Sequence, residues 1–190
     1  MASNELLVSV DVETDGPIPS DYAMISIGAC TLDLNLEFYS EIKPISKSFV
    51  PEALQVSGLD REYLVKHGKD PYEVMRNLAE WLKDITEPIN ARPVFVGWNA
   101  PFDWMFVNWY FHKFYGANPF GWCGWDGKAY YAGLTKNTVW SSVNKKSVKK
   151  KGFLSDEFPH THNALEDAKE QAVLFSRLLS YAGSNISCYQ

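Results

Sequence analysis

The stretch LLVSVDVETDG, from Leu6 to Gly16, decides how this chain is expected to fold. Aliphatic residues occupy the even positions from 6 to 12, whereas Ser9, Asp11 and Glu13 occupy odd positions. Successive side chains of a strand point to opposite faces. The alternation therefore predicts a strand over residues 5–13 with one apolar face and one face that carries both carboxylates. The turn-forming residues that follow it end the strand.

The rest of the chain continues this strand into an α/β domain. Two further strands, over 24–32 and 38–42, are joined by a short polar turn, which favours an antiparallel meander. A buried strand is expected over 93–97. Helices are expected over residues 51–56, 71–85, 101–115 and 163–181, and a polar loop or short helix over 141–152. Strands followed by alternating helices and strands indicate a single domain, which we place at 1–183, with a C-terminal tail over 184–190.

Composition sets modest bounds on function. The 190 residues carry a formal net charge of −5, which argues against a protein that coats nucleic acid, because such proteins are usually basic. Three widely spaced cysteines, Cys30, Cys123 and Cys188, favour reduced thiols over a disulfide framework. No stretch approaches the roughly 18 apolar residues of a membrane span. We therefore expect a soluble, cytoplasmic protein with no membrane partner.

Asp11 and Glu13 form the first candidate site. Both carboxylates leave the same face near the C-terminal end of their strand, and ligands of open α/β sheets bind at that end. Two carboxylates this close repel one another in a partly dry site unless a cation neutralises them. A solvated strand end would show the same pattern by chance, so the pair alone indicates a metal site only weakly.

Asp103 is the third candidate carboxylate. It lies in the first turn of the helix expected to begin at Pro101, directly after the strand over 93–97. An acidic residue there is common without any function, because the helix macrodipole favours it. Asn99 adds a second hydrogen-bonding side chain at the same corner, which favours a binding site.

His162 and Asp167 complete the set. Five residues apart on one helix, their side chains would diverge by about 140°, so they cannot share a face if both are helical. Asn163 is a good N-cap, and Glu166 three positions later can complete a capping box. His162 then precedes the helix, while Asp167 lies in its first turn on the buried side. An inward carboxylate is costly unless it is paired or metal-bound.

These five residues together indicate a two-metal site. Oxygen ligands with one histidine and no cysteine favour Mg²⁺, with Mn²⁺ as a substitute, over Zn²⁺. Two such ions about 4 Å apart can activate a water and stabilise the leaving oxygen in phosphoryl displacement. Histidine titrates near neutral pH and can accept the proton of that water.

The chain resembles the DEDDh 3′–5′ exonucleases, a family with the RNase H-like fold that includes RNase T, oligoribonuclease and polymerase proofreading subunits. The DVET motif at 11–14, the NAPFD motif at 99–103 and His162 with Asp167 carry the resemblance. The segments 51–60 and 118–134 are most similar to RNase T. The resemblance covers nearly the whole chain.

The resemblance implies a mixed five-stranded sheet flanked by helices. It also implies that two Mg²⁺ ions are bound by four carboxylates, with His162 as the general base. It places Thr14 near the terminal 3′-hydroxyl, Met24 or Ile25 against the last base, and Asn99 among the substrate contacts. The catalytic set that it implies is Asp11, Glu13, Asp103, His162 and Asp167.

Two features outside the motifs leave alternatives open. The lysines between Lys145 and Lys151 could hold incoming phosphates or simply line a solvated loop. The tryptophans between Trp98 and Trp125 could stack on bases, or pack in the core or against a second copy in a homodimer.

We therefore expect a metal-dependent exonuclease that degrades single-stranded nucleic acid from a free 3′-hydroxyl, RNA ahead of DNA, and releases 5′-mononucleotides. One alternative is an exoribonuclease restricted to short oligonucleotides. The other is a catalytically silent nucleic-acid-binding module on the same fold, which would have no need of all five residues.

Overall fold

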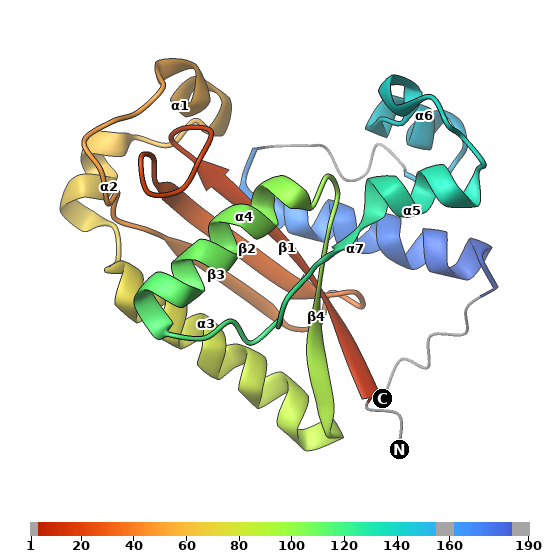
Figure 1. The fold of residues 1–190 in the computed structure, drawn as a ribbon, viewed down its shortest axis with the longest axis horizontal. Coiled ribbons are helices and arrows are strands. Elements are labelled where there is room, and N and C mark those ends of the chain that lie inside the picture. The colour runs from red at the N-terminus through yellow and green to blue at the C-terminus, as the bar shows by residue number, and fades with distance from the viewer. Residues whose placement is uncertain (1–3, 155–161, 184–190) are drawn as a thin grey trace.

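The computed structural model describes residues 4–154 and 162–183, and shows one five-stranded sheet flanked by helices (Figure 1). The strands follow the order β3-β2-β1-β4-β5, so β1 lies at the centre. β1, β2 and β3 form an antiparallel meander, whereas β4 and β5 run parallel to β1. The strands are β1 (Asn4–Thr14), β2 (Met24–Thr31), β3 (Glu37–Glu41), β4 (Ala91–Gly97) and β5 (Trp125–Asp126). The predicted mixed sheet and meander are confirmed.

Helices cover both faces of the sheet. Helices α3 and α4 pack on the face that carries the aliphatic residues of β1, and α7 packs on the opposite face against β1 and β2 (Figure 1). The α-helices are α1 (Pro51–Ser57), α2 (Arg61–His67), α3 (Pro71–Thr86), α4 (Pro101–Tyr110), α5 (Gly127–Leu134), α6 (Lys145–Lys150) and α7 (Ala164–Tyr181). Two short 3₁₀ turns, Glu87–Ile89 and Trp140–Ser142, complete the order.

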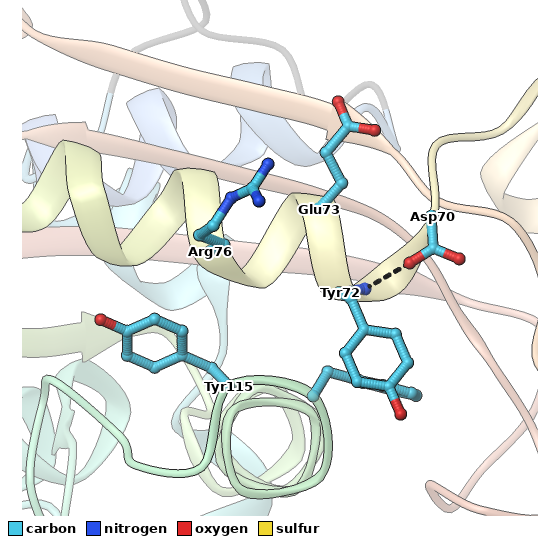
Figure 2. A pocket seen from close by; sticks show the side chains of 6 residues that line it. Asp70, Tyr72, Glu73, Arg76 and Tyr115 are labelled. Carbon is cyan, nitrogen blue, oxygen red and sulfur yellow. Dashed lines mark hydrogen bonds between the residues drawn. The ribbon is translucent and has the colours of Figure 1, made fainter.

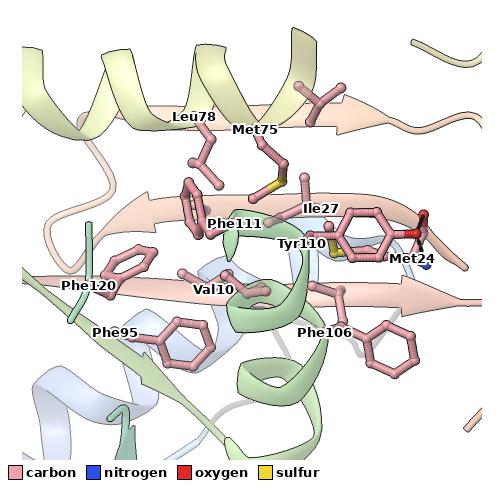
Figure 3. Close-up of a cluster of buried hydrophobic side chains, with 14 of the residues drawn as sticks. Val10, Met24, Ile27, Met75, Leu78, Phe95, Phe106, Tyr110, Phe111 and Phe120 are labelled. Atoms are coloured by element: carbon pink, nitrogen blue, oxygen red, sulfur yellow. Dashed lines mark hydrogen bonds between the residues drawn. The ribbon is translucent and has the colours of Figure 1, made fainter. Parts of the chain in front are cut away.

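The main hydrophobic core lies between the sheet and helices α3 and α4. Val10 on β1, Met75 on α3 and Phe106 on α4 are fully buried in it (Figure 3). Complete burial of a side chain of this size contributes about 1.5–3 kcal/mol. This face of β1 therefore holds α4 against the sheet, and α4 carries Asp103 at its beginning.

The structure differs from the sequence-based prediction in four elements. The helix expected over 101–115 is α-helical only to Tyr110 and continues as a π-helical turn, Phe111–Tyr115, which closes with a hydrogen bond from Gly116 to the Phe111 carbonyl. Helices α2 and α5 and the short strand β5 were not predicted. Helix α2 buries only Leu64, and β5 is only two residues long. Neither segment therefore shows a repeating pattern of apolar residues from which a helix or strand could be predicted. The expected tail over 184–190 lies outside the described residues.

Candidate active site

The first part of the site forms where β1 and β4 separate. The parallel pairing of these strands ends at Ser9 and Val96, and the chain then turns from β4 into α4. The backbone N–H of Val12, beyond that point, donates to Asp103 Oδ1 at 3.1 Å. Beyond Ser9, β4 no longer pairs with β1. The buried side chain of Asp103 therefore accepts the Val12 N–H in place of a strand carbonyl. This contact brings the beginning of α4 against the end of β1, beside Asp11 and Glu13.

Helix α7 supplies the second part because it approaches β2 unusually closely. Gly28 on β2 is the pairing partner of Asp11. A Cβ atom at Gly28 would lie only 2.3 Å from the backbone of Ala164, so only glycine allows this approach. The Ser9 hydroxyl, on the same sheet face, donates to the Ala168 carbonyl at 2.8 Å. These contacts hold the first turns of α7 on the sheet and bury Asp167 completely.

His162 lies beside the carboxylates, immediately before α7. His162, Glu13 and Asp167 each offer one atom that could bind a metal ion. These three atoms lie within 4.8 Å of one another. His162 adopts a left-handed backbone conformation with φ 55°, in which histidine is several-fold enriched among the few non-glycine residues found there. The structure therefore places His162 ahead of the helix, as predicted, and directs it to the acidic site.

The N-cap of α7 is partly as predicted. Asn163 accepts hydrogen bonds from the N–H groups of Leu165 and Glu166. Glu166 does not complete a capping box among the hydrogen bonds of residues 4–154 and 162–183. Its carboxylate pairs instead with Lys169 at 3.1 Å, because a cation one turn along the helix is within reach of an exposed glutamate.

The site strongly disfavours negative charge unless a cation is present. Burial, with smaller contributions from the charges of Asp167 and Asp103, raises the pKa of Glu13 to about 8. Burial also raises the pKa of Asp103 to about 7, although the Val12 N–H bond opposes the rise. The pKa of Asp11 is raised well above its ordinary value, first by burial and then by Asp103, Asp167 and Glu13. Mutual repulsion of this kind is relieved by binding divalent cations.

The donor set fits hard divalent cations. Carboxylate oxygens are the ligands that Mg²⁺ and Mn²⁺ prefer, and the buried carboxylates lack neighbouring arginines that would neutralise them among the described residues. Asp11, Glu13, Asp103 and Asp167 would hold the ions. His162 can act either as a further ligand or as a proton acceptor.

The predicted substrate contacts divide into two groups. Thr14 is buried, and its hydroxyl donates to the Gly16 carbonyl at 2.9 Å. Asn99 is exposed at the turn between β4 and α4, with φ 65°. Met24 and Ile25, in contrast, are fully buried and pack in hydrophobic clusters of the core. Every residue of β2 is buried, because helices cover both faces of this strand. The periodicity of the sequence alone could not show that both faces are covered.

Two residues near the site, Glu170 and Gln171, were missed by the sequence analysis, which considered Lys145 only as part of the lysine segment. Gln171 donates to Asp11 and accepts the Trp98 N–H. Lys145 on α6 forms an ion pair with Glu170, which is buried on α7. The positive charge of Lys145 lowers the pKa of Asp11. No short motif marks these positions, although Glu170 and Gln171 follow Asp167 on the inner side of α7 by three and four residues.

A separate surface pocket of about 460 Å³ lies between the beginning of α3 and the π-helical turn. Figure 2 shows its aromatic walls, Tyr72 and Tyr115, together with Arg76. None of the predicted catalytic residues lines it. The carboxylate site and this pocket are therefore separate features.

Comparison with known proteins identifies the family. The description of the matching family is the Rv2179c-like 3′-5′ exoribonuclease domain, and its model matches residues 7–179. The chain belongs to this family. A relative in Escherichia coli, the 3′-5′ DNA exonuclease Cap18, is 42% identical over 172 residues, which are 90% of each chain.

Solved structures with the same fold include DEDDh exonucleases. The nuclease domain of 3′hExo, described as a DEDDh family member bound to rAMP, superposes with a TM-score of 0.74 at 15% identity, covering 95% of this chain and 94% of that one. Escherichia coli exonuclease I with a dT13 oligonucleotide gives a TM-score of 0.69 at 16% identity, covering 93% and 41%. The DEDDh resemblance and the RNase H-like fold are thus confirmed.

The chain is accordingly a 3′–5′ exonuclease and not a silent binding module. Within residues 4–154 and 162–183, helices long and apolar enough to cross a bilayer are absent.

Proposed function

We propose that this protein is a magnesium-dependent exonuclease that removes 5′-mononucleotides one at a time from the free 3′-hydroxyl end of single-stranded nucleic acid. The observation that carries the proposal is the convergence of His162 with Glu13 and Asp167, within 4.8 Å, beside the half-buried Asp11 and the buried Asp103. A module that only bound nucleic acid would gain nothing from buried carboxylates, because they repel phosphates.

The residues of the site divide the work of hydrolysis. Two bound Mg²⁺ ions would supply activation of the attacking water and stabilisation of the leaving oxygen. The four carboxylates hold the ions at the end of β1. His162 accepts the proton of the attacking water at a ring nitrogen. The water oxygen forms a bond to phosphorus while the bond between phosphorus and the O3′ of the penultimate nucleotide breaks. The released O3′ takes a proton from solvent, which leaves a new 3′-hydroxyl on the shortened strand and frees a 5′-mononucleotide.

The descriptions of related proteins support both RNA and DNA as the substrate. The family description names an exoribonuclease, in line with the preference for RNA expected from the sequence. The Escherichia coli relative, which shares 42% identity over nine-tenths of both chains, is named a DNA exonuclease. Because that likeness extends over the whole catalytic domain, we propose that single-stranded DNA is a substrate alongside RNA.

The lysine segment lies next to the site and supports contact with the substrate backbone. Lys145 is three-quarters buried in its ion pair with Glu170, whereas Lys146 and Lys150 on the same helix are exposed. Exposed lysines beside an exonuclease site attract the phosphates of a single strand. We assign that role to the exposed lysines of α6.

The test uses 5′-labelled RNA and DNA of identical sequence, from 3 to 30 nucleotides, with Mg²⁺, Mn²⁺ or EDTA. We expect ladders that shorten by one nucleotide from the 3′ end, release of 5′-mononucleotides, and no reaction in EDTA. A 3′-phosphate should block the reaction. Rapid cutting of a circular single strand would show an endonuclease and contradict the proposal, and activity confined to the shortest substrates would favour the short-oligonucleotide alternative.

A further inference from the structure

The side chain of Gln171 connects the separate elements that carry the acidic site. Its amide nitrogen donates to Asp11 Oδ1 at 2.5 Å, and its amide oxygen accepts the backbone N–H of Trp98 at 2.6 Å. Gln171 is only 5% exposed. It lies on α7, one helical turn after Asp167.

These two contacts determine which way the amide faces. A backbone N–H can only donate, so the amide oxygen of Gln171 must face Trp98 and its NH₂ group must face Asp11. A hydrogen bond from an amide to a carboxylate is charge-assisted and stronger than one between neutral groups. Gln171 therefore fixes the rotation of the Asp11 carboxylate without adding charge to a site that already holds several acids.

Gln171 also acts on the turn that leads to Asp103. Trp98 begins the turn between β4 and α4, and the N–H of Ala100, on the other side of this turn, donates to Asp126 at 2.6 Å. The turn is thus held at both ends, and α4 begins directly after it with Asp103 in its first turn.

We propose that Gln171 is a positioning residue for divalent metal binding. Through one amide it links β1 with Asp11, the turn before Asp103 and helix α7 with Asp167. Side chains that orient metal ligands typically contribute ~10–100-fold to metal affinity or activity. This inference rests on the proposed metal-dependent function, and it assigns Gln171 no direct contact with metal or substrate.

The test compares Gln171→Met and Gln171→Asn with Ser176→Ala. Methionine fills the same volume and makes neither hydrogen bond, whereas asparagine keeps an amide that is too short to bridge both partners. Ser176 lies on the same helix and donates to the Leu32 carbonyl, away from the carboxylates, so its loss controls for a weaker attachment of α7. Thermal unfolding establishes that each variant is folded.

Metal binding is measured directly by the electron paramagnetic resonance signal of free Mn²⁺, and separately by the Mg²⁺ concentration that gives half-maximal exonuclease turnover. We expect both Gln171 variants to need ~10–100-fold more metal, with turnover at saturating metal reduced much less, and Ser176→Ala to match the wild type. Binding curves of both variants that superimpose on the wild-type curve would overturn the proposal. A wild-type protein that binds no Mn²⁺ would instead overturn the proposed function.

Discussion

Asp15 and Glu13 lie two residues apart in the chain, and the protein surrounds their carboxylates in different ways. Asp15 is completely buried, but it accepts hydrogen bonds from Arg61 at 2.9 Å and from the Ala23 N–H at 2.6 Å. Only two residues earlier, Glu13 belongs to a cluster of acids whose charges repel one another. Asp15 thus is paired with an internal cation, whereas the pKa values of Asp11 and Asp103 stay raised although the charge of Lys145 lowers them. The difference separates a structural carboxylate from functional ones.

The largest expected effect follows from removing one charge of the cluster. We expect Asp103→Asn to lower turnover by orders of magnitude, because a metal ligand loses its charge. Asparagine can still accept the Val12 N–H bond, and the repulsion within the cluster falls, so thermal stability should stay similar or rise in EDTA. Turnover and unfolding measured on the same sample check both parts. Wild-type turnover in Mg²⁺ would remove Asp103 from the site.

Replacing His162 tests the histidine of the cluster. We expect His162→Ala to lose ~10²–10⁴-fold in turnover, the usual range for a general base. The four carboxylates remain, so Mn²⁺ affinity should change little, and the histidine limb of the pH–rate profile should disappear. If metal affinity falls together with turnover, His162 is a ligand. If neither changes, it is a surface histidine without a role.

The matched substitution at the structural carboxylate should act in the opposite sense. Asp15→Asn leaves Arg61, only 14% exposed, without its charged partner. Breaking a buried ion pair in this way typically costs about 3–5 kcal/mol of unfolding free energy. We expect Asp15→Asn to unfold at lower temperature than the wild type, and to bind Mn²⁺ normally while folded. Equal stability of Asp15→Asn and Asp103→Asn in EDTA would remove the distinction between the two groups.

The smallest expected effect is the pH dependence of stability without metal. The pKa values of Glu13 and Asp103 rise to about 8 and about 7 in the folded protein, from ordinary values of 4.5 and 3.8. Between about pH 4 and pH 8 the folded state therefore holds protons that the unfolded chain has lost, so stability in EDTA falls as pH rises through this range. Unfolding temperatures at pH 5 to 8 check the slope.

Two comparisons sharpen this pH prediction. Added Mg²⁺ should raise the unfolding temperature more at pH 8 than at pH 5, because the ions then bind carboxylates that have lost their protons. Glu13→Gln should show a shallower slope than the wild type in EDTA. Identical slopes for the two proteins would mean that the pKa of Glu13 is not raised.

The prediction from sequence was accurate where a local pattern carried the information. Alternation in β1 placed Asp11 and Glu13 on one face, and the expected N-cap at Asn163 separated His162 from its helix. The contact with the last base that the resemblance implies for Met24 or Ile25 stays a prediction, and the structure buries both side chains. Residue type alone cannot distinguish an apolar side chain that contacts a ligand from one that packs in the core.

The sequence by itself determined the antiparallel meander, the buried strand that precedes α4 and the family, because strand periodicity, helix caps and short acidic motifs depend on neighbours in the chain. Only the tertiary structure decided what surrounds the candidate site residues. The absence of a side chain at Gly28 lets α7 approach β2, and Gln171 joins Asp11 to Trp98 across 160 and 73 positions of the chain. Such contacts depend on packing between distant segments, and no local pattern encodes them.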